Sequence, residues 1–267
     1  MKKEEIALLK RKIFLKLGKD NIRAIVFFGS RARGDYREDS DYDINVYLTH
    51  RKNTWGIGFN NFINYQINII DTIRFRDMKK EAHPFLYCTF RDGIPLYQKD
   101  KWFDKTRKSI LLMSPTSKIV KEYFRRGLGQ LCSLYWRLGR DKKDFFPLID
   151  LHYEDGKVAA NHIGFGLVMF YKKYPKSPRT LGQEIIRLNK GYKRLALTIK
   201  YLQRAYYESA SSSKRVYMQN VQNLYLFTKR FVQKNFSKEY KEIQTLEKIY
   251  RKVDRDMKLK KQLNIEK

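Results

Sequence analysis

The first hundred residues show two different hydrophobic periods, so this part of the chain is predicted to mix helices with strands. Between residues 2 and 18, the apolar side chains Ile6, Leu9 and Ile13 recur at helical spacing, and charged residues fill the other positions. Residues 22–28 are almost continuously apolar, as is typical of a buried strand. The further predicted elements are a short helix after Ser30 that Gly34 ends, strands at 41–48, 65–72 and 94–97, a loop at 50–61 and helical structure at 77–91 around Pro84.

After about Lys101 the pattern predicts helices only. These helices are expected at 117–140, 156–174, 180–188, 192–211, 214–236 and 238–258. We therefore predict an α+β protein with two domains. A small domain with a mixed sheet, residues 1–102, precedes an all-α helical bundle, residues 103–267.

The stretch from Gly29 to Asp43 combines a glycine turn with two nearby carboxylates. Gly29-Ser30 follows the buried strand directly, and the free N–H groups at the start of a short helix there would suit phosphate oxygens. Asp41 and Asp43 open the second strand, so their side chains share one face, about 6 to 7 Å apart along the strand. Two such carboxylates can share divalent cations, which predicts a metal and phosphate site.

This stretch resembles the signature of the DNA polymerase beta-like nucleotidyltransferase superfamily, and most closely its minimal nucleotidyltransferase group. Its two parts read Gly29-Ser30-Arg31-Ala32-Arg33-Gly34 and Ser40-Asp41-Tyr42-Asp43-Ile44. Turn, spacing, acid pair and flanking strands agree over roughly the first 100 residues. The resemblance implies an enzyme that moves a nucleoside monophosphate from a nucleoside triphosphate (NTP) to an acceptor hydroxyl.

The resemblance also implies roles for individual residues. The nucleotide would be bound by Gly29, Ser30, Arg33 and Ser40. Asp41 and Asp43 would be catalytic metal ligands, holding Mg²⁺ or Mn²⁺ that bridges the triphosphate and assists attack on the α-phosphorus.

The third predicted strand departs from the pattern of the family. The family usually supplies a third acid here, in the order apolar, Asp, apolar, apolar, Asp, but residues 67–71 read Ile-Asn-Ile-Ile-Asp. Alternation places Asn68 in the catalytic position, whereas Asp71 falls on the other face. An asparagine ligates Mg²⁺ through its carbonyl but cannot act as a general base. Asn68 is therefore a third catalytic candidate, and a degenerate domain that binds RNA or a protein without turnover is the alternative.

The positive charge of the chain is concentrated in its second part. Residues 1–100 hold 19 basic and 13 acidic residues, whereas residues 101–267 hold 38 basic and 15 acidic, which is +23 of the total +29. Such a charge attracts a polyanion, so RNA, for example a tRNA end, is the favoured acceptor; a cationic drug would call for an acidic cleft. A protein hydroxyl or a small-molecule hydroxyl remains an alternative, and Lys and Arg can also be solubilising surface.

The helical part is similar, more weakly, to the helical domains of antibiotic nucleotidyltransferases and of the HEPN family. The RNases of that family use an arginine followed, after four to six residues, by a histidine. Neither His152 nor His162 has an arginine at this spacing, so no such RNase activity is predicted.

Two groups of residues in the helical part are weaker candidates. Basic and aromatic side chains that suit RNA occur at Tyr123, Arg125 and Arg126 and along 214–235. Carboxylates that could provide a general base occur at Asp150, Glu154 and Asp155.

Targeting signals are not apparent in the sequence. No run of eighteen apolar residues occurs, and the N-terminus lacks the apolar core of a signal peptide. We therefore expect a cytoplasmic protein with no membrane partner, and the sequence leaves its oligomeric state open.

Overall fold

The computed structural model describes residues 3–50, 64–140, 149–208 and 213–237, and also residues 240, 241, 244, 245 and 248. The side chains of residues 135–140, 149–152 and 214 are outside this description. The chain divides into two compact units, Met1–Thr116 and Ser117–Lys267.

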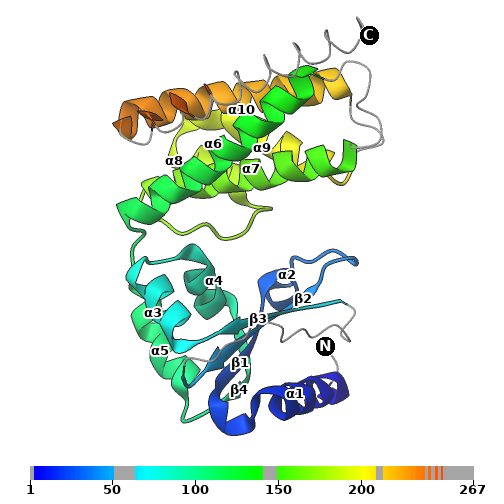
Figure 1. Ribbon diagram of the computed structural model, residues 1–267, viewed down its shortest axis with the longest axis vertical. Coiled ribbons are helices and arrows are strands. Elements are labelled where there is room, and N and C mark those ends of the chain that lie inside the picture. The colour runs from blue at the N-terminus through cyan, green and yellow to red at the C-terminus, as the bar shows by residue number, and fades with distance from the viewer. Residues whose placement is uncertain are drawn as a thin grey trace, which may run out of the picture. The chain divides into compact units, whose positions relative to one another are not determined.

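The first unit contains a mixed sheet of four strands (Figure 1). The strands are β1 (Ile22–Phe28), β2 (Tyr42–Leu48), β3 (Tyr65–Ile70) and β4 (Ile94–Gln98), in the order β3-β2-β1-β4. β1 is antiparallel to both β2 and β4, whereas β2 and β3 are parallel. The predicted mixed sheet is confirmed.

Helices cover the two faces of this sheet (Figure 1). On one face, α1 (Lys3–Leu17) packs Leu9, Ile13 and Leu17 into a core with the strands. On the other face lie α3 (Thr72–Lys80), α4 (Pro84–Asp92) and α5 (Trp102–Leu111). Because side chains alternate along a strand, the even-numbered apolar residues of β2 face α1 and Tyr47 faces the other three helices.

The boundary between β3 and α3 differs from the prediction. The predicted strand continued to residue 72 and the helix began at 77, but β3 ends at Ile70 and α3 begins at Thr72. Asp71 is the reason, since its side chain accepts a hydrogen bond of 2.8 Å from the backbone N–H of Arg74 and so caps the helix. Pro84 separates α3 from α4, in which it occupies the first turn, where no intrahelical N–H is needed.

The helix α5 belongs to the core of the first unit. It begins where the sequence predicted a change of domain, and it buries Phe103 and Ile110 completely. The ring of Phe103 stacks on that of Phe90 in α4 at 4.5 Å between centroids. The division of the chain after residue 102 remains a prediction, whereas these contacts attach residues 102–111 to the sheet.

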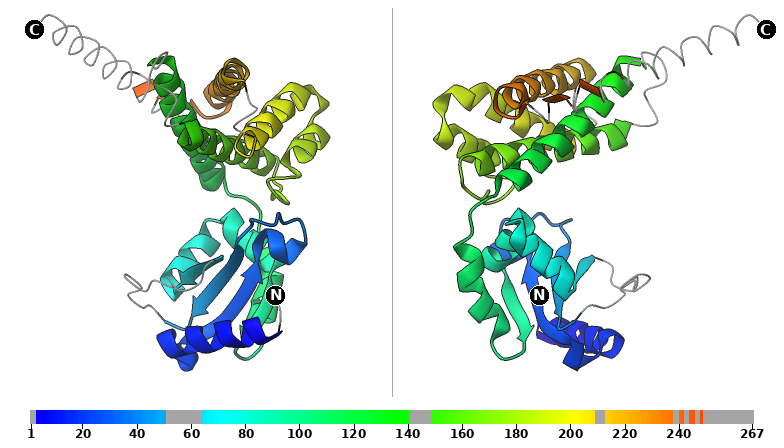
Figure 2. Two further views of the ribbon diagram at one scale, coloured as in Figure 1. Left: turned by 90° about the vertical axis from the view of Figure 1, so that its right-hand side faces the viewer. Right: turned by 60° about the vertical axis from the view of Figure 1, so that its left-hand side comes forward.

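The second unit is helical, as predicted, and forms its own core (Figure 2). Its helices are α6 (Ser117–Arg140), α7 (Ile149–Phe170), α8 (Leu181–Leu188), α9 (Lys193–Ala205) and α10 (Lys214–Asn235). α7 begins seven residues before the predicted start at Gly156. Gly156 therefore lies inside the helix, where its lack of a side chain lets α7 approach α10. A Cβ at Gly156 would overlap the hydroxyl of Tyr217. Most of the helix predicted at 238–258 lies outside the described residues.

None of the helices in the described part of the chain is both long and apolar enough to cross a membrane.

Candidate functional site

The turn after β1 lies directly against the second strand. Phe28, the last residue of β1, pairs with Asp43 in β2, and the chain then enters the short helix α2 (Gly29–Arg33). Gly29 has a φ of +81°, and a Cβ on it would overlap the carboxylate of Asp43. Only glycine adopts this conformation freely and leaves room for the carboxylate, which explains the glycine at this position.

Asp43 is the carboxylate with the most perturbed environment in this site. Burial and, to a smaller extent, the negative charge of Asp41 raise its pKa to about 6, and the positive charge of Arg33 opposes this shift. These effects place the two acids and the arginine of the predicted site close enough to interact. Asp41 itself is exposed and immediately precedes β2.

Ser40 closes a turn in the loop that presents Asp41. Its hydroxyl oxygen accepts a 2.9 Å hydrogen bond from the backbone N–H of Arg37, and its own N–H donates to the Arg37 carbonyl at 3.0 Å. The hydroxyl keeps its own proton as a donor. Ser40 therefore shapes the loop in addition to the predicted role in nucleotide binding.

Arg33 lies between two carboxylates. One guanidinium nitrogen is 3.2 Å from Asp35 and the other is 3.5 Å from Asp92. Asp92 ends α4, its side chain is 11% exposed, and it also accepts hydrogen bonds from Nε and Nη2 of Arg91, at 2.6 and 2.7 Å. The positive charge of Arg33 also opposes the rise in the pKa of Asp43. Sequence reasoning missed Asp92, since 59 residues separate it from Arg33.

Asn68 lies on the same face of the sheet as Asp43, but not level with it. The parallel register pairs Asp43 with Gln66 and pairs Asn68 with Asn45, one two-residue step farther along the strands. Asn45 is fully buried and donates a 2.9 Å hydrogen bond to Thr89 of α4. Gln66 is thus the residue of β3 next to Asp43, and its side chain is neutral. Sequence reasoning gave it no role.

Arg31 is a third residue to which sequence reasoning gave no role. Its guanidinium donates to the carbonyl of Ser40 at 2.7 Å and to the carbonyl of Glu38 at 2.8 Å. The same group lies over the rings of Tyr42 and Tyr36, at 4.3 and 4.8 Å from their centroids. Arg31 therefore connects α2 to the loop before β2, so it holds the glycine turn and Asp41 in register. A planar, forked cation that also stacks is needed for these contacts, and lysine lacks that geometry.

Substituting Arg31 with lysine is expected to weaken the binding of Mg²⁺ and NTP about 10-fold, or about 1.4 kcal/mol, because the loop with Asp41 loses its anchor. Isothermal titration of Mg²⁺·ATP into each protein measures this change. The control is Arg37→Lys in the same loop, whose side chain is 46% exposed. Equal affinities of Arg31→Lys and the wild type would show that Arg31 does not position the site.

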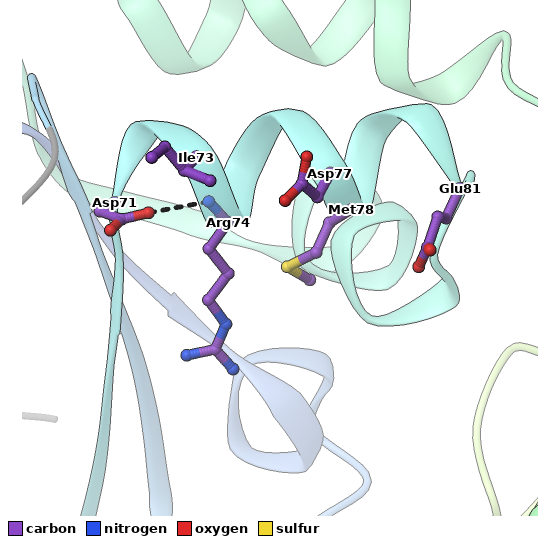
Figure 3. A pocket seen from close by; sticks show the side chains of 6 residues that line it. All are labelled: Asp71, Ile73, Arg74, Asp77, Met78 and Glu81. Atoms are coloured by element: carbon purple, nitrogen blue, oxygen red, sulfur yellow. Dashed lines mark hydrogen bonds between the residues drawn. The ribbon is translucent and has the colours of Figure 1, made fainter.

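A pocket of about 340 Å³ runs along α3 (Figure 3). Its lining residues are Asp71, Ile73, Arg74, Asp77, Met78 and Glu81. Asp71, which matches the last acid of the family pattern, points to the backbone of Arg74 and serves as the helix cap described above (Figure 3). It thus has a structural role in starting α3.

The pair of carboxylates fits a divalent cation. Within the described residues, no group of three or more His, Cys, Asp or Glu side chains is arranged to hold a metal ion. Mg²⁺ is nevertheless often held by one or two carboxylates, with phosphates and water as its other ligands. Asp41 raises the pKa of Asp43 by repulsion, and a cation shared by both would remove this cost.

The weaker candidates of the helical unit include two arginines of α6 and three carboxylates at the start of α7. Glu122 accepts hydrogen bonds from Arg125 at 2.8 Å and from Arg126 at 2.7 Å, and the bond from Arg125 is the main cause that lowers the pKa of Glu122 to about 2. Glu154 is exposed, and Asp155 is partly buried. The side chain of Asp150 lies outside the described residues.

Comparisons with known proteins found a similar solved structure and a matching family model. A crystal structure of a nucleotidyltransferase-like protein from Exiguobacterium sibiricum 255-15 is similar at 11% sequence identity and a TM-score of 0.39, over 88% of this chain and 77% of that chain. No curated protein matches the chain. The family model of the Polymerase beta nucleotidyltransferase domain matches residues 11–102, which are 92 of the 267 residues. The glycine turn and both aspartates therefore lie within the part of the chain that matches this family model.

Proposed function

We propose that the protein transfers a nucleoside monophosphate from an NTP to a hydroxyl of RNA, for example a tRNA end, and releases pyrophosphate. The observation that carries this proposal is the position of Asp43. Its partly buried carboxylate lies against a glycine turn and beside a second acid. Such a pair has little structural use without a cation, because burial and repulsion both disfavour its charge. The match of residues 11–102 to a nucleotidyltransferase family supports the same chemistry.

Some residues of the first unit would bind the triphosphate, and others would bind the cation. The Gly29-Ser30 turn, Arg33 and the hydroxyl of Ser40 would hold the triphosphate. Asp41 and Asp43 would hold Mg²⁺ or Mn²⁺, and the cation would neutralise charge that builds up on phosphate oxygens.

The reaction forms one bond and breaks another at the α-phosphorus. The acceptor oxygen bonds to this phosphorus, the bond to pyrophosphate breaks, and the proton of the hydroxyl leaves to solvent or to a carboxylate. In this scheme Asn68 and Gln66 would be neutral auxiliaries near the aspartates, because an amide cannot take up that proton.

The choice of RNA as acceptor rests on charge. Residues 101–267 carry +23, which favours a polyanion over a cationic small molecule. A protein hydroxyl or a small-molecule hydroxyl would use the same first unit with a different acceptor surface.

Incubation of the full chain with α-labelled NTPs, Mg²⁺ and total RNA tests the proposal. The wild type is expected to label RNA, and Asp41→Ala is expected to lower labelling by about 100-fold or more, because the cation loses a ligand. The matched control is Asp39→Ala, two residues away, whose side chain is 73% exposed. Labelling that persists in Asp41→Ala, or that is absent from the wild type with every acceptor class, would contradict the proposal.

A second candidate function is a binding module without turnover. The neutral residues of β3 favour it, since Gln66 and Asn68 occupy the face where a third carboxylate would stand. Such a module would bind RNA with normal affinity while Mg²⁺·NTP failed to raise its melting temperature. The enzyme, in contrast, is expected to show both RNA labelling and this rise.

A further inference from the structure

A short segment of the helical unit carries a very one-sided charge. Residues 172–194, here named the basic segment, contain eight basic residues and a single acid, Glu184. All eight basic side chains are exposed. They are Lys172, Lys173, Lys176, Arg179, Arg187, Lys190, Lys193 and Arg194. The segment comprises the loop after α7, all of α8 and the start of α9.

Two tyrosines bring the ends of the basic segment together. The hydroxyls of Tyr171 and Tyr192 are 3.1 Å apart, and their ring centroids are 6.4 Å apart. Lys172 follows Tyr171, and Lys190 and Lys193 lie within two residues of Tyr192, so this contact brings together basic residues from both ends of the segment. Burial and the neighbouring Tyr171 raise the pKa of Tyr192 to about 12.

The loop of the basic segment is anchored to the bundle. Gln203 of α9 donates to the carbonyl of Pro178 at 2.9 Å and to the side chain of Asn161 at 2.7 Å. The buried hydroxyl of Ser177 accepts from the backbone N–H of Arg179 at 3.1 Å. Basic side chains on a fixed backbone lose less entropy when they bind than those on a loose tail.

The single acid of the basic segment is used to hold the loop. Glu184 accepts the backbone N–H of Lys176 at 3.1 and 3.2 Å and the hydroxyl of Thr180 at 2.5 Å. Glu122, by contrast, binds the guanidinium groups of Arg125 and its neighbour on α6, so those charges are partly compensated. The structure therefore favours the basic segment over the α6 arginines that the sequence suggested.

We infer that the basic segment is the surface that binds the phosphodiester backbone of RNA. This inference rests on the proposed function, because it names where the acceptor is held. Convergent, exposed and preorganised cations suit a chain of phosphates, and half-buried tyrosines beside them offer ring edges to bases. An anionic membrane fits less well, since none of the exposed large apolar side chains lies between residues 172 and 194.

Charge-neutralising variants of the full chain test this inference. The segment variant combines Lys173→Gln, Lys190→Gln and Arg194→Gln. The control variant combines Lys118→Gln, Lys200→Gln and Lys241→Gln, whose side chains are also exposed and lie outside the basic segment. Both lose three positive charges. Fluorescence anisotropy with a labelled single-stranded RNA, at several salt concentrations, measures affinity and its salt dependence.

The segment variant is expected to bind RNA about 10- to 100-fold more weakly than the wild type at physiological salt, and the slope of log affinity against log salt should fall by roughly 2. The control variant should stay within about 3-fold of the wild type. Equal losses in the two variants would overturn the inference, because net charge alone would then explain binding. Unchanged RNA affinity in the segment variant, together with lost binding to phosphatidylserine vesicles, would overturn it in favour of a membrane surface.

The same proteins separate this inference from the proposed function. Mg²⁺·ATP should raise the melting temperature of the wild type, the segment variant and the control variant alike, because the substitutions lie in the second unit. RNA binding that depends on the basic segment, without labelling of any acceptor, would sink the proposed transfer and leave the RNA surface standing. If RNA is labelled but both variants bind RNA equally, the proposed transfer stands and the inference about the basic segment falls.

Discussion

Replacing Asp43 with asparagine is expected to lower nucleotidyl transfer by about 1000-fold or more and, at the same time, to stabilise the first unit at neutral pH. Activity falls because the amide is neutral and holds a divalent cation poorly. Stability rises because the folded protein pays for keeping this carboxylate charged, through burial and through repulsion by Asp41. Substitution of a residue with only a structural role would not lower activity while raising stability.

The sign of the pH dependence follows from the raised pKa of Asp43. The folded value is about 6 and the ordinary value is 3.8, so the folded protein binds the proton more tightly than the unfolded chain. The wild type therefore loses stability as pH rises from about 4 to about 6, and the loss persists above that window. Its size is on the order of 1 kcal/mol, once screening of a partly exposed carboxylate is allowed for.

Thermal melts of the metal-free protein across this pH range measure the effect. Asp43→Asn should melt above the wild type at about pH 7.5 and level with it near pH 3, below both pKa values, where Asp43 is mostly protonated in both states. Asp39→Asn, an exposed acid of the same loop, should melt with the wild type throughout. A lower melting temperature for Asp43→Asn at neutral pH, or full transfer activity, would show that Asp43 is not the strained metal ligand inferred here.

Substituting Gly29 with alanine is expected to be the most damaging change to the turn. Its φ of +81° is unfavourable for alanine, and the added Cβ would overlap the carboxylate of Asp43. The backbone must shift or Asp43 must move, so we expect a loss of about 2–4 kcal/mol in the free energy of unfolding. We also expect Mg²⁺·NTP binding to fall by about 100-fold or more, because the turn and the carboxylate no longer fit together.

Gly34→Ala is a matched control for this prediction. Gly34 has a φ of +79°, so alanine meets the same backbone strain, but an added Cβ would have no atom within 4 Å. It should cost only about 1–2 kcal/mol and leave nucleotide affinity within about 3-fold of the wild type. Denaturant unfolding and Mg²⁺·ATP titration of both variants measure these values. Equal effects at Gly29 and Gly34 would mean that backbone strain, and not contact with Asp43, explains why the turn needs glycine.

Local pattern determined much of the first unit. The continuous apolar run of β1, the Gly29 turn and the alternation of β2 are properties of adjacent residues, and each formed as predicted. The same alternation placed Asn68 on the face of Asp43. The end of β3 was predicted wrongly, because Asp71 was read within the strand although its side chain caps the next helix.

Tertiary structure alone decided which residues meet at the site. The register of β2 and β3 sets Gln66, and not Asn68, level with Asp43, and a register cannot be deduced from either strand by itself. Contacts of Arg33 with Asp92, and of Tyr171 with Tyr192, join residues 59 and 21 positions apart. The sequence by itself determined the motif, the acid pair and the excess of positive charge. The fold decided that burial would raise the pKa of Asp43 and that Tyr171 and Tyr192 would join the two ends of the basic segment, because burial and such contacts exist only once separate elements have packed.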